Sequence, residues 1–110
     1  MLFKRTVTEN GEKVTIAVSG KFNYTAFTEF KATFEDATES VTSFDVDLSA
    51  VTHMDSSALG MLIILKEHAR DQHATVRIVN PSNPAKRSLS VSLFDKLFEI
   101  ANGVASRQSG

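Results

Sequence analysis

The feature that most constrains the fold of this chain is an apolar strand that runs into a polar corner and then into a strongly hydrophobic helix. Alternating apolar side chains at residues 44–48 predict a short central strand, and the polar run Asp55-Ser56-Ser57 follows it. The next apolar residues predict a helix from about Ser57 to Gln72. Because a helix start offers unpaired N–H groups and the positive end of the helix dipole, the Ser56 hydroxyl would stand where a phosphate or another anion can be held.

The N-terminal third of the chain predicts a hairpin and an aromatic helix. Apolar and polar residues alternate on both sides of the turn at residues 9–12, which is typical of two antiparallel strands. A helix is expected from Thr25 to Thr38, because Phe27, Phe30 and Phe34 recur at spacings of three and four. We interpret these three rings as part of the core.

The C-terminal half continues the alternation of strands and helices. We expect a strand at Thr75–Val79, a short helix at Pro84–Ser92 and an apolar terminal segment at Leu93–Ile100. Together with the hairpin, this order indicates an α/β domain with a mixed sheet covered by helices.

Composition narrows the class of protein. A chain of 110 residues with 42% hydrophobic residues suffices for one domain with a core, and the polar tail 102–110 is expected to be loosely ordered. The net charge of −1, without a basic stripe, argues against nucleic acid as a partner, and zero cysteines exclude disulfides and thiolate metal sites. The apolar run 58–65 is far shorter than a membrane span and the first residues lack a signal peptide, so we expect a cytoplasmic protein without membrane insertion.

The segment 47–60 reads DLSAVTHMDSSALG. It resembles the signature of the STAS domains, named for sulfate transporters and anti-sigma factor antagonists, and in particular their stand-alone bacterial antagonists. Ala58 stands where the family commonly has glycine. Residues 79–82 and 94–100 are similar to the family's later strand-to-turn segment and its closing helix, so the resemblance covers nearly the whole chain. It implies one STAS domain over residues 1–101, with a mixed sheet opened by the hairpin and about four helices.

The resemblance also implies a function and a site. Stand-alone antagonists bind a partner when unmodified and release it when a serine kinase of anti-sigma type phosphorylates them, and a serine phosphatase resets them. By resemblance Ser56 is the phosphoacceptor and Ser57 the runner-up. Asn23 stands where family members often carry an acid. The expected partner-binding residues are Asn23, Asp55, Ser56, Ser57, Ala58 and Met61.

Two plainer interpretations stay open for these residues. Asp and Ser are preferred helix N-caps, so capping alone could explain Asp55 and Ser56. Met61 could equally pack in the core or belong to an exposed partner-binding patch. A second function is also open, because STAS domains serve as constitutive structural subunits of membrane transporter assemblies.

Catalysis and metal binding are not expected. His53, Asp55 and Ser56 are close in sequence, but a catalytic triad is assembled from separated segments, and we expect His53 to be an exposed loop residue. His53, His68 and His73 have no cysteines beside them, and the last two are five residues apart, which does not suit a helical metal pair. We expect no cofactor, and a chain that is monomeric on its own.

Overall fold

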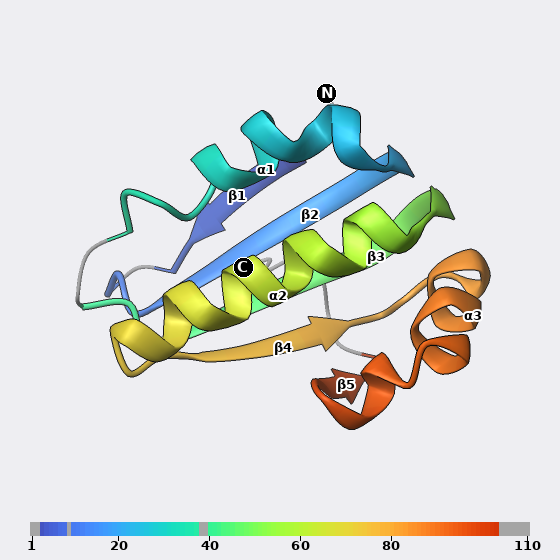
Figure 1. Ribbon diagram of the computed structural model, residues 1–110. Helices are drawn as coiled ribbons and strands as arrows, with labels where there is room; N and C mark the ends of the chain where they lie inside the picture. Colours follow the sequence, from blue (N-terminus) through green and yellow to red (C-terminus); the bar gives the residue numbers. More distant parts are fainter. Residues whose placement is uncertain (1–2, 9, 38–39, 104–110) are drawn as a thin grey trace.

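The computed structural model describes residues 3–8, 10–37 and 40–103, which form a mixed sheet of five strands with helices packed against it (Figure 1). The strands lie side by side in chain order, so the central strand is β3. The first pair is antiparallel and the other three pairs are parallel, as the predicted mixed sheet requires. The strands are β1 Phe3–Val7, β2 Lys13–Phe22, β3 Ser43–Met54, β4 Thr75–Val79 and β5 Glu99–Ala101.

The predicted hairpin is confirmed, although Glu9 of its turn lies outside the described residues. Strands β2 and β3, which end together before the polar corner, are longer than predicted. A break in the β2–β3 register at Gly20, whose φ of +81° is a conformation that suits glycine, lets β2 continue to Phe22. Because β2 and β3 pair along this whole length, β3 is a strand of 12 residues rather than a short one.

The helix predicted over residues 25–38 is shorter than expected. A 3₁₀ turn, η1 Tyr24–Ala26, leads into α1 Phe27–Ala32, while Thr38 lies outside the described residues. Phe30 and Phe34 are buried as predicted, but Phe27 is 38% exposed, so its place in the core was predicted wrongly. Phe27 is the first residue of α1 and Phe34 lies beyond its last residue, Ala32, so a single helical period does not carry all three rings to one face.

The two later helices agree with their predictions to within a residue at each end. They are α2 Ser56–Asp71 and α3 Asn83–Val91. The helices α1 and α2 cover the same face of the sheet (Figure 1), where alternate residues of β2 and β3 are buried. The core between them includes Val14, Ile16, Phe30, Phe34, Phe44, Val46, Leu62 and Leu65.

The closing helix predicted from the family resemblance is absent from residues 94–100. Leu93 has a left-handed conformation with φ of 63°, which ends the α3 segment, and a 3₁₀ turn, η2 Phe94–Lys96, follows. The chain then forms β5. Its backbone groups make hydrogen bonds with β4 and not within a helix. Across the described residues, three α-helices and two 3₁₀ turns agree roughly with the expected number of about four helices.

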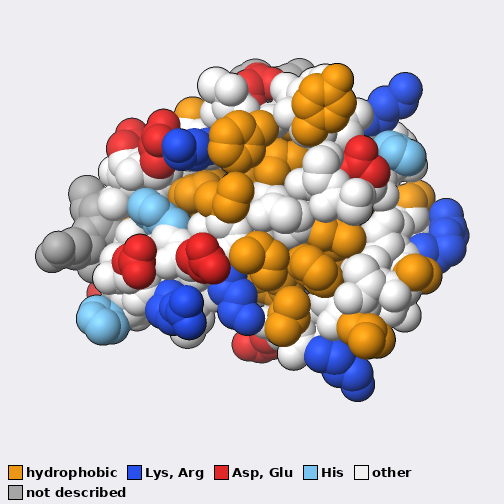
Figure 2. Space-filling model, in the orientation of Figure 1, with side chains coloured by type: hydrophobic (Ala, Val, Ile, Leu, Met, Phe, Trp, Pro, Cys, Tyr) orange, Lys and Arg blue, Asp and Glu red, His pale blue; other side chains and the backbone are white. Residues whose placement is uncertain are grey.

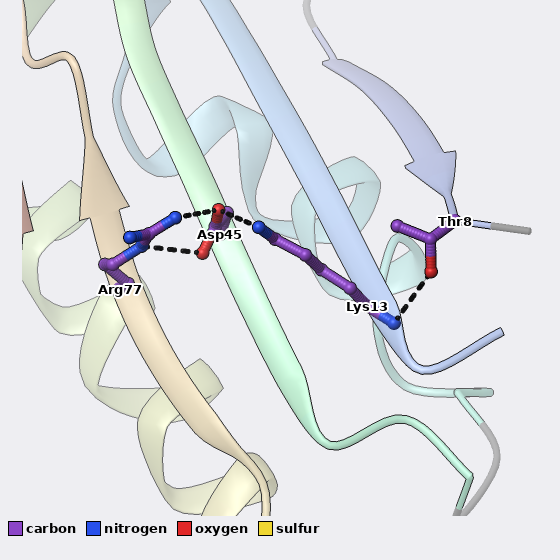
Figure 3. A network of polar contacts seen from close by, with 4 residues as sticks. All are labelled: Thr8, Lys13, Asp45 and Arg77. Atoms are coloured by element: carbon purple, nitrogen blue, oxygen red, sulfur yellow. Dashed lines mark hydrogen bonds and ion pairs between the residues drawn. The ribbon is translucent and has the colours of Figure 1, made fainter. Parts of the chain in front are cut away.

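A buried carboxylate joins the three middle strands on the opposite face of the sheet. Asp45 of β3 is 4% exposed and accepts hydrogen bonds from Arg77 of β4 at 3.1 and 2.8 Å, while Lys13 Nζ of β2 lies 2.9 Å from it (Figure 3). Burial alone would raise the pKa of Asp45, but the hydrogen bonds and charges of Arg77 and Lys13 outweigh it and lower the pKa. Asp45 therefore remains charged and links β2, β3 and β4.

No described helix combines the length and the apolar character that crossing a bilayer requires.

Candidate functional site

The polar corner lies where the parallel strands β2 and β3 end together. Phe22 pairs with Met54, and Asp55 N donates to Phe22 O at 3.5 Å, so the residues that follow both strands are neighbours. Asp55 is the N-cap of α2. Its Oδ1 accepts hydrogen bonds from the backbone N–H groups of Ser57 at 3.0 Å and Ala58 at 3.2 Å, which satisfies two of the free donors at the helix start.

The Asp55 carboxylate is held in its charged form. The Ser57 hydroxyl donates to Asp55 Oδ1 at 2.6 Å, and this hydrogen bond is the main reason that the pKa of Asp55 is lowered. Partial burial acts in the opposite direction, and the two backbone hydrogen bonds and the nearby charge of His53 add to the lowering. The corner therefore carries a negative charge at neutral pH.

The structure distinguishes the two serines. Ser56 is the first residue of α2 and is exposed, and its hydroxyl forms no hydrogen bond with any residue that the structure describes. Ser57 is half-buried and its hydroxyl is engaged with Asp55. Because Asp55 alone provides the side-chain cap, capping does not explain Ser56, whose hydroxyl remains accessible.

Of the other expected partner-binding residues, Asn23 lies beside the corner, whereas Ala58 and Met61 are buried. Asn23 follows β2 beside the corner, and its Oδ1 accepts hydrogen bonds from Thr25 N at 3.0 Å and Thr25 Oγ1 at 2.6 Å. Ala58 and Met61 are buried, Met61 to 3% exposure, because they lie on the side of α2 that faces the sheet. Their side chains therefore offer no surface to a partner, and for Met61 the core interpretation is the correct one.

The histidines lie in different surroundings. His53 is exposed as predicted, but it lies in β3, paired with Lys21 of β2, and not in a loop. The His68 ring packs 5.1 Å from that of Phe34, and His73 follows the C-terminal end of α2. Within the described part of the chain, no three histidine, cysteine or acidic side chains are grouped as a metal site would require.

Sequence reasoning missed two sets of residues. One is the Asp45 network, although the alternation of acids in residues 44–48 marked a polar face of β3. The other is a group of exposed apolar side chains: Tyr24 and Phe27 after β2, and Ile64 in the middle of α2. Ile64 follows Ser56 by two helical steps of four residues, a spacing that could have identified it as exposed.

Sequence comparisons are consistent with this geometry. The family model described as "Mlab, STAS domain" matches residues 6–99. A STAS-domain containing protein of Pseudomonas aeruginosa strain UCBPP-PA14 is 35% identical over 92 residues, which cover 84% of this chain and 91% of that protein.

Solved structures share the fold at low sequence identity. The anti-sigma factor antagonist SpoIIAA in its unphosphorylated form matches with a TM-score of 0.79 and 18% identity, over 93% of this chain and 88% of that chain. A sulfate transporter family protein from Wolinella succinogenes matches with a TM-score of 0.73 and 14% identity, over 87% of this chain and 80% of that chain. Since the family model spans most of the sequence and the Pseudomonas relative shares 35% of the aligned residues, this chain belongs to the STAS domain family.

Proposed function

We propose that this STAS domain is a phosphorylation-controlled binding module of a partner-switching pathway, like an anti-sigma factor antagonist. The unphosphorylated form binds its partner through the surface around Ser56. A serine kinase of anti-sigma type phosphorylates Ser56 and abolishes binding, and a serine phosphatase restores it. The observation that carries this proposal is the difference between the two serines, since Asp55 and Ser57 complete the cap and leave the Ser56 hydroxyl exposed.

The start of α2 can hold the product of this reaction without refolding. A phosphoserine carries a charge of roughly −1.5 to −2 at pH 7, and the positive end of the helix dipole stabilises such a charge. The same charge next to the Asp55 carboxylate penalises an interface that must remove both from water. A change in bound fraction from about 99% to about 1% needs a difference of about 5.5 kcal/mol in binding free energy, which one desolvated dianion can supply.

The test is mass spectrometry of the protein isolated from its source cells under conditions that preserve phosphate. We expect one added phosphate, mapped by peptide analysis to Ser56 and lost in Ser56→Ala. The matched control is Ser57→Ala, which removes a neighbouring hydroxyl and should keep the phosphate. Absence of phosphate under every growth condition, with Ser56→Ala functioning as wild type, would contradict the proposal.

The second candidate is a constitutive structural subunit of a membrane transporter assembly. It is favoured by the fold that this chain shares with the sulfate transporter family protein from Wolinella succinogenes. In this case the Ser56 surface packs against a transporter subunit without being modified. Co-purification with membrane proteins at constant stoichiometry, together with the absence of phosphate, would favour this function over switching.

Both candidates describe a binding module rather than an enzyme. The Ser56 hydroxyl has no base hydrogen-bonded to it among the described residues, which distinguishes it from an activated nucleophile. We place the module in the cytoplasm, where the kinase and its ATP are available.

A further inference from the structure

Three large aliphatic side chains are exposed where α3 ends and η2 follows. Val91 is 85% exposed, Leu93 63% and Leu97 46%. Figure 2 shows hydrophobic side chains bordered by Lys and Arg side chains in the lower right part of this face, where Figure 1 places α3 and η2. We call the surface formed by these three residues together with the exposed Arg87 and Lys96 the η2 surface.

A repeated Leu-Phe pair explains why the two leucines point outward. The segment 93–98 reads LFDKLF. The rings of Phe94 and Phe98 stack with their centroids 6.1 Å apart, and both side chains pack on the core. Because the phenylalanines occupy the inside of the turn, the leucine before each of them remains on the outside. Lys66 Nζ of α2 holds the turn in place by donating to Leu97 O at 2.7 Å.

Leu93 is held in a conformation that leucine rarely adopts. Its φ of 63° and ψ of 20° lie in the left-handed region, where the Cβ of an L residue crowds the backbone. A glycine would end α3 here without that strain. Strained residues of this kind cluster at functional positions. Since most of the Leu93 side chain is exposed and contributes little to the core, its retention points to a role at the surface.

The η2 surface has an excess of positive charge. Residues 83–98 include three basic residues and one acidic residue, although the whole chain has a net charge of −1. The basic residues Lys86, Arg87 and Lys96 are exposed and form no ion pair within the described part of the chain. Arg87 lies one helical turn before Val91, and Lys96 is next to Leu97, so cations flank the apolar side chains.

The acids nearest to this surface do not cancel its charge. The groove between α2 and β5 is lined by two acids, Glu67 and Glu99, and by two cations, Lys66 and Arg70, which match them in number. Glu99 also lies opposite Arg77 in the pairing of β5 with β4. The positive excess of Lys86, Arg87 and Lys96 over the single acid of their segment therefore remains.

Apolar side chains flanked by cations fit an anionic lipid surface. Aliphatic groups enter the boundary between headgroups and acyl chains, while basic groups stay at the level of the lipid phosphates. We propose that the η2 surface docks this protein on membranes that contain anionic lipids, with its leucines entering the headgroup region and its cations facing the phosphates. This inference goes beyond the proposed function and does not depend on it.

Docking in this way leaves the polar corner accessible. Lys66, which binds the Leu97 carbonyl, lies ten residues after Ser56 on α2. Ten residues correspond to about 15 Å along a helix axis. A protein that rests on a membrane through the η2 surface can therefore still present Ser56 to a partner.

The test measures how much of the protein sediments with lipid vesicles. One set of vesicles contains equal parts of phosphatidylglycerol and phosphatidylcholine, and the other contains phosphatidylcholine alone. We expect binding to the anionic vesicles at about 0.1 M salt and its loss at about 1 M, where the screening length falls from about 10 Å to about 3 Å. Lys96→Gln should lower the partition coefficient about fivefold and Leu93→Gln about tenfold.

Leu93→Gly separates backbone strain from membrane binding. Glycine adopts a φ of 63° without strain, so the thermal midpoint of this variant should rise. Its vesicle binding should fall about as far as that of Leu93→Gln, because both variants remove the aliphatic side chain. Unchanged vesicle binding in Leu93→Gly would overturn the proposal, whatever its stability.

The matched controls lie at the opposite edge of the sheet. Val7 is 44% exposed and Lys4 is exposed, and both belong to β1, whereas the η2 surface adjoins β5. Val7→Gln and Lys4→Gln remove the same kinds of group as Leu93→Gln and Lys96→Gln. Both controls should bind the anionic vesicles as the wild type does. Circular dichroism of every variant checks that the fold is kept.

The other outcomes overturn the proposal. No sedimentation with anionic vesicles at low salt, or equal binding to the neutral vesicles, would contradict docking on anionic lipids. Equal losses in the β1 controls would mean that a different surface binds the vesicles. If light scattering shows a wild-type dimer that Leu93→Gln dissociates, the η2 surface binds a second copy instead. All of these measurements are independent of Ser56 phosphorylation, so the proposed function is tested separately.

Discussion

Asp45 and Asp55 belong to the same stretch of chain and both have a lowered pKa, but their surroundings differ. Asp45 lies inside β3 and is neutralised by cationic side chains from β2 and β4. Asp55 lies just beyond β3 and is stabilised by three hydrogen bonds from two residues of its own segment, Ser57 and Ala58. A carboxylate stabilised by distant strands holds those strands together, whereas one stabilised locally leaves the surrounding surface free for a partner.

The largest effect is expected at the buried carboxylate. Asp45→Asn removes a charged acceptor from Arg77 and Lys13 and should lower the free energy of unfolding by about 2–3 kcal/mol. Urea denaturation monitored by circular dichroism measures this. The control is Asp36→Asn, which breaks the exposed Arg5–Asp36 pair at 3.2 Å and should cost less than about 1 kcal/mol. Equal costs for the two variants would show that Asp45 is not structural.

Acid should remove part of the same stabilisation. The folded pKa of Asp45 lies below its unfolded value, so its contribution is complete above about pH 4 and is lost as the pH falls through the folded pKa. Wild type should therefore lose stability as the pH falls below about 4, and Asp45→Asn should show a shallower loss. Unfolding midpoints measured across this range test the difference. An unchanged slope in the variant would mean that Asp45 ionisation does not contribute.

A smaller effect is expected at the cap. Asp55→Ala removes the acceptor for the first N–H groups of α2 and should cost about 1 kcal/mol, whereas Asp55→Asn keeps a good N-cap and should cost less. Thermal or urea unfolding measures both. If Asp55→Ala lowered the free energy of unfolding as much as Asp45→Asn does, the N-cap would stabilise the fold as strongly as the buried Asp45 network.

The smallest effect on stability is expected at the neighbouring hydroxyl, where the pKa of Asp55 is the better measurement. Ser57→Ala removes the hydrogen bond that contributes most to lowering this pKa, so the Asp55 pKa should rise toward its ordinary value. Ser56→Ala should leave it unchanged. Carbon-detected NMR titration of the carboxylate distinguishes the two serines. A rise in both variants would contradict the different roles assigned to them.

Local patterns predicted most of the fold. The hairpin, the strand Thr75–Val79, and α2 and α3 were found because apolar periodicity, turns and caps are encoded within a few residues. The closing helix and the length of α1 were predicted wrongly. In both segments, contacts with a neighbouring strand or helix decide whether the backbone forms a helix. The spacing of apolar residues in the sequence does not show those contacts.

The sequence by itself determined that a serine stands at the start of a helix after a central strand, because strand, cap and helix signals are local. Tertiary structure alone decided that Ser56 is accessible while Ser57 is engaged, that Met61 is buried and Phe27 exposed, and that Asp45 meets Arg77 and Lys13. These outcomes depend on which elements pack together and on how β2, β3 and β4 are aligned. Such contacts join residues far apart in the chain, so no window of sequence contains them.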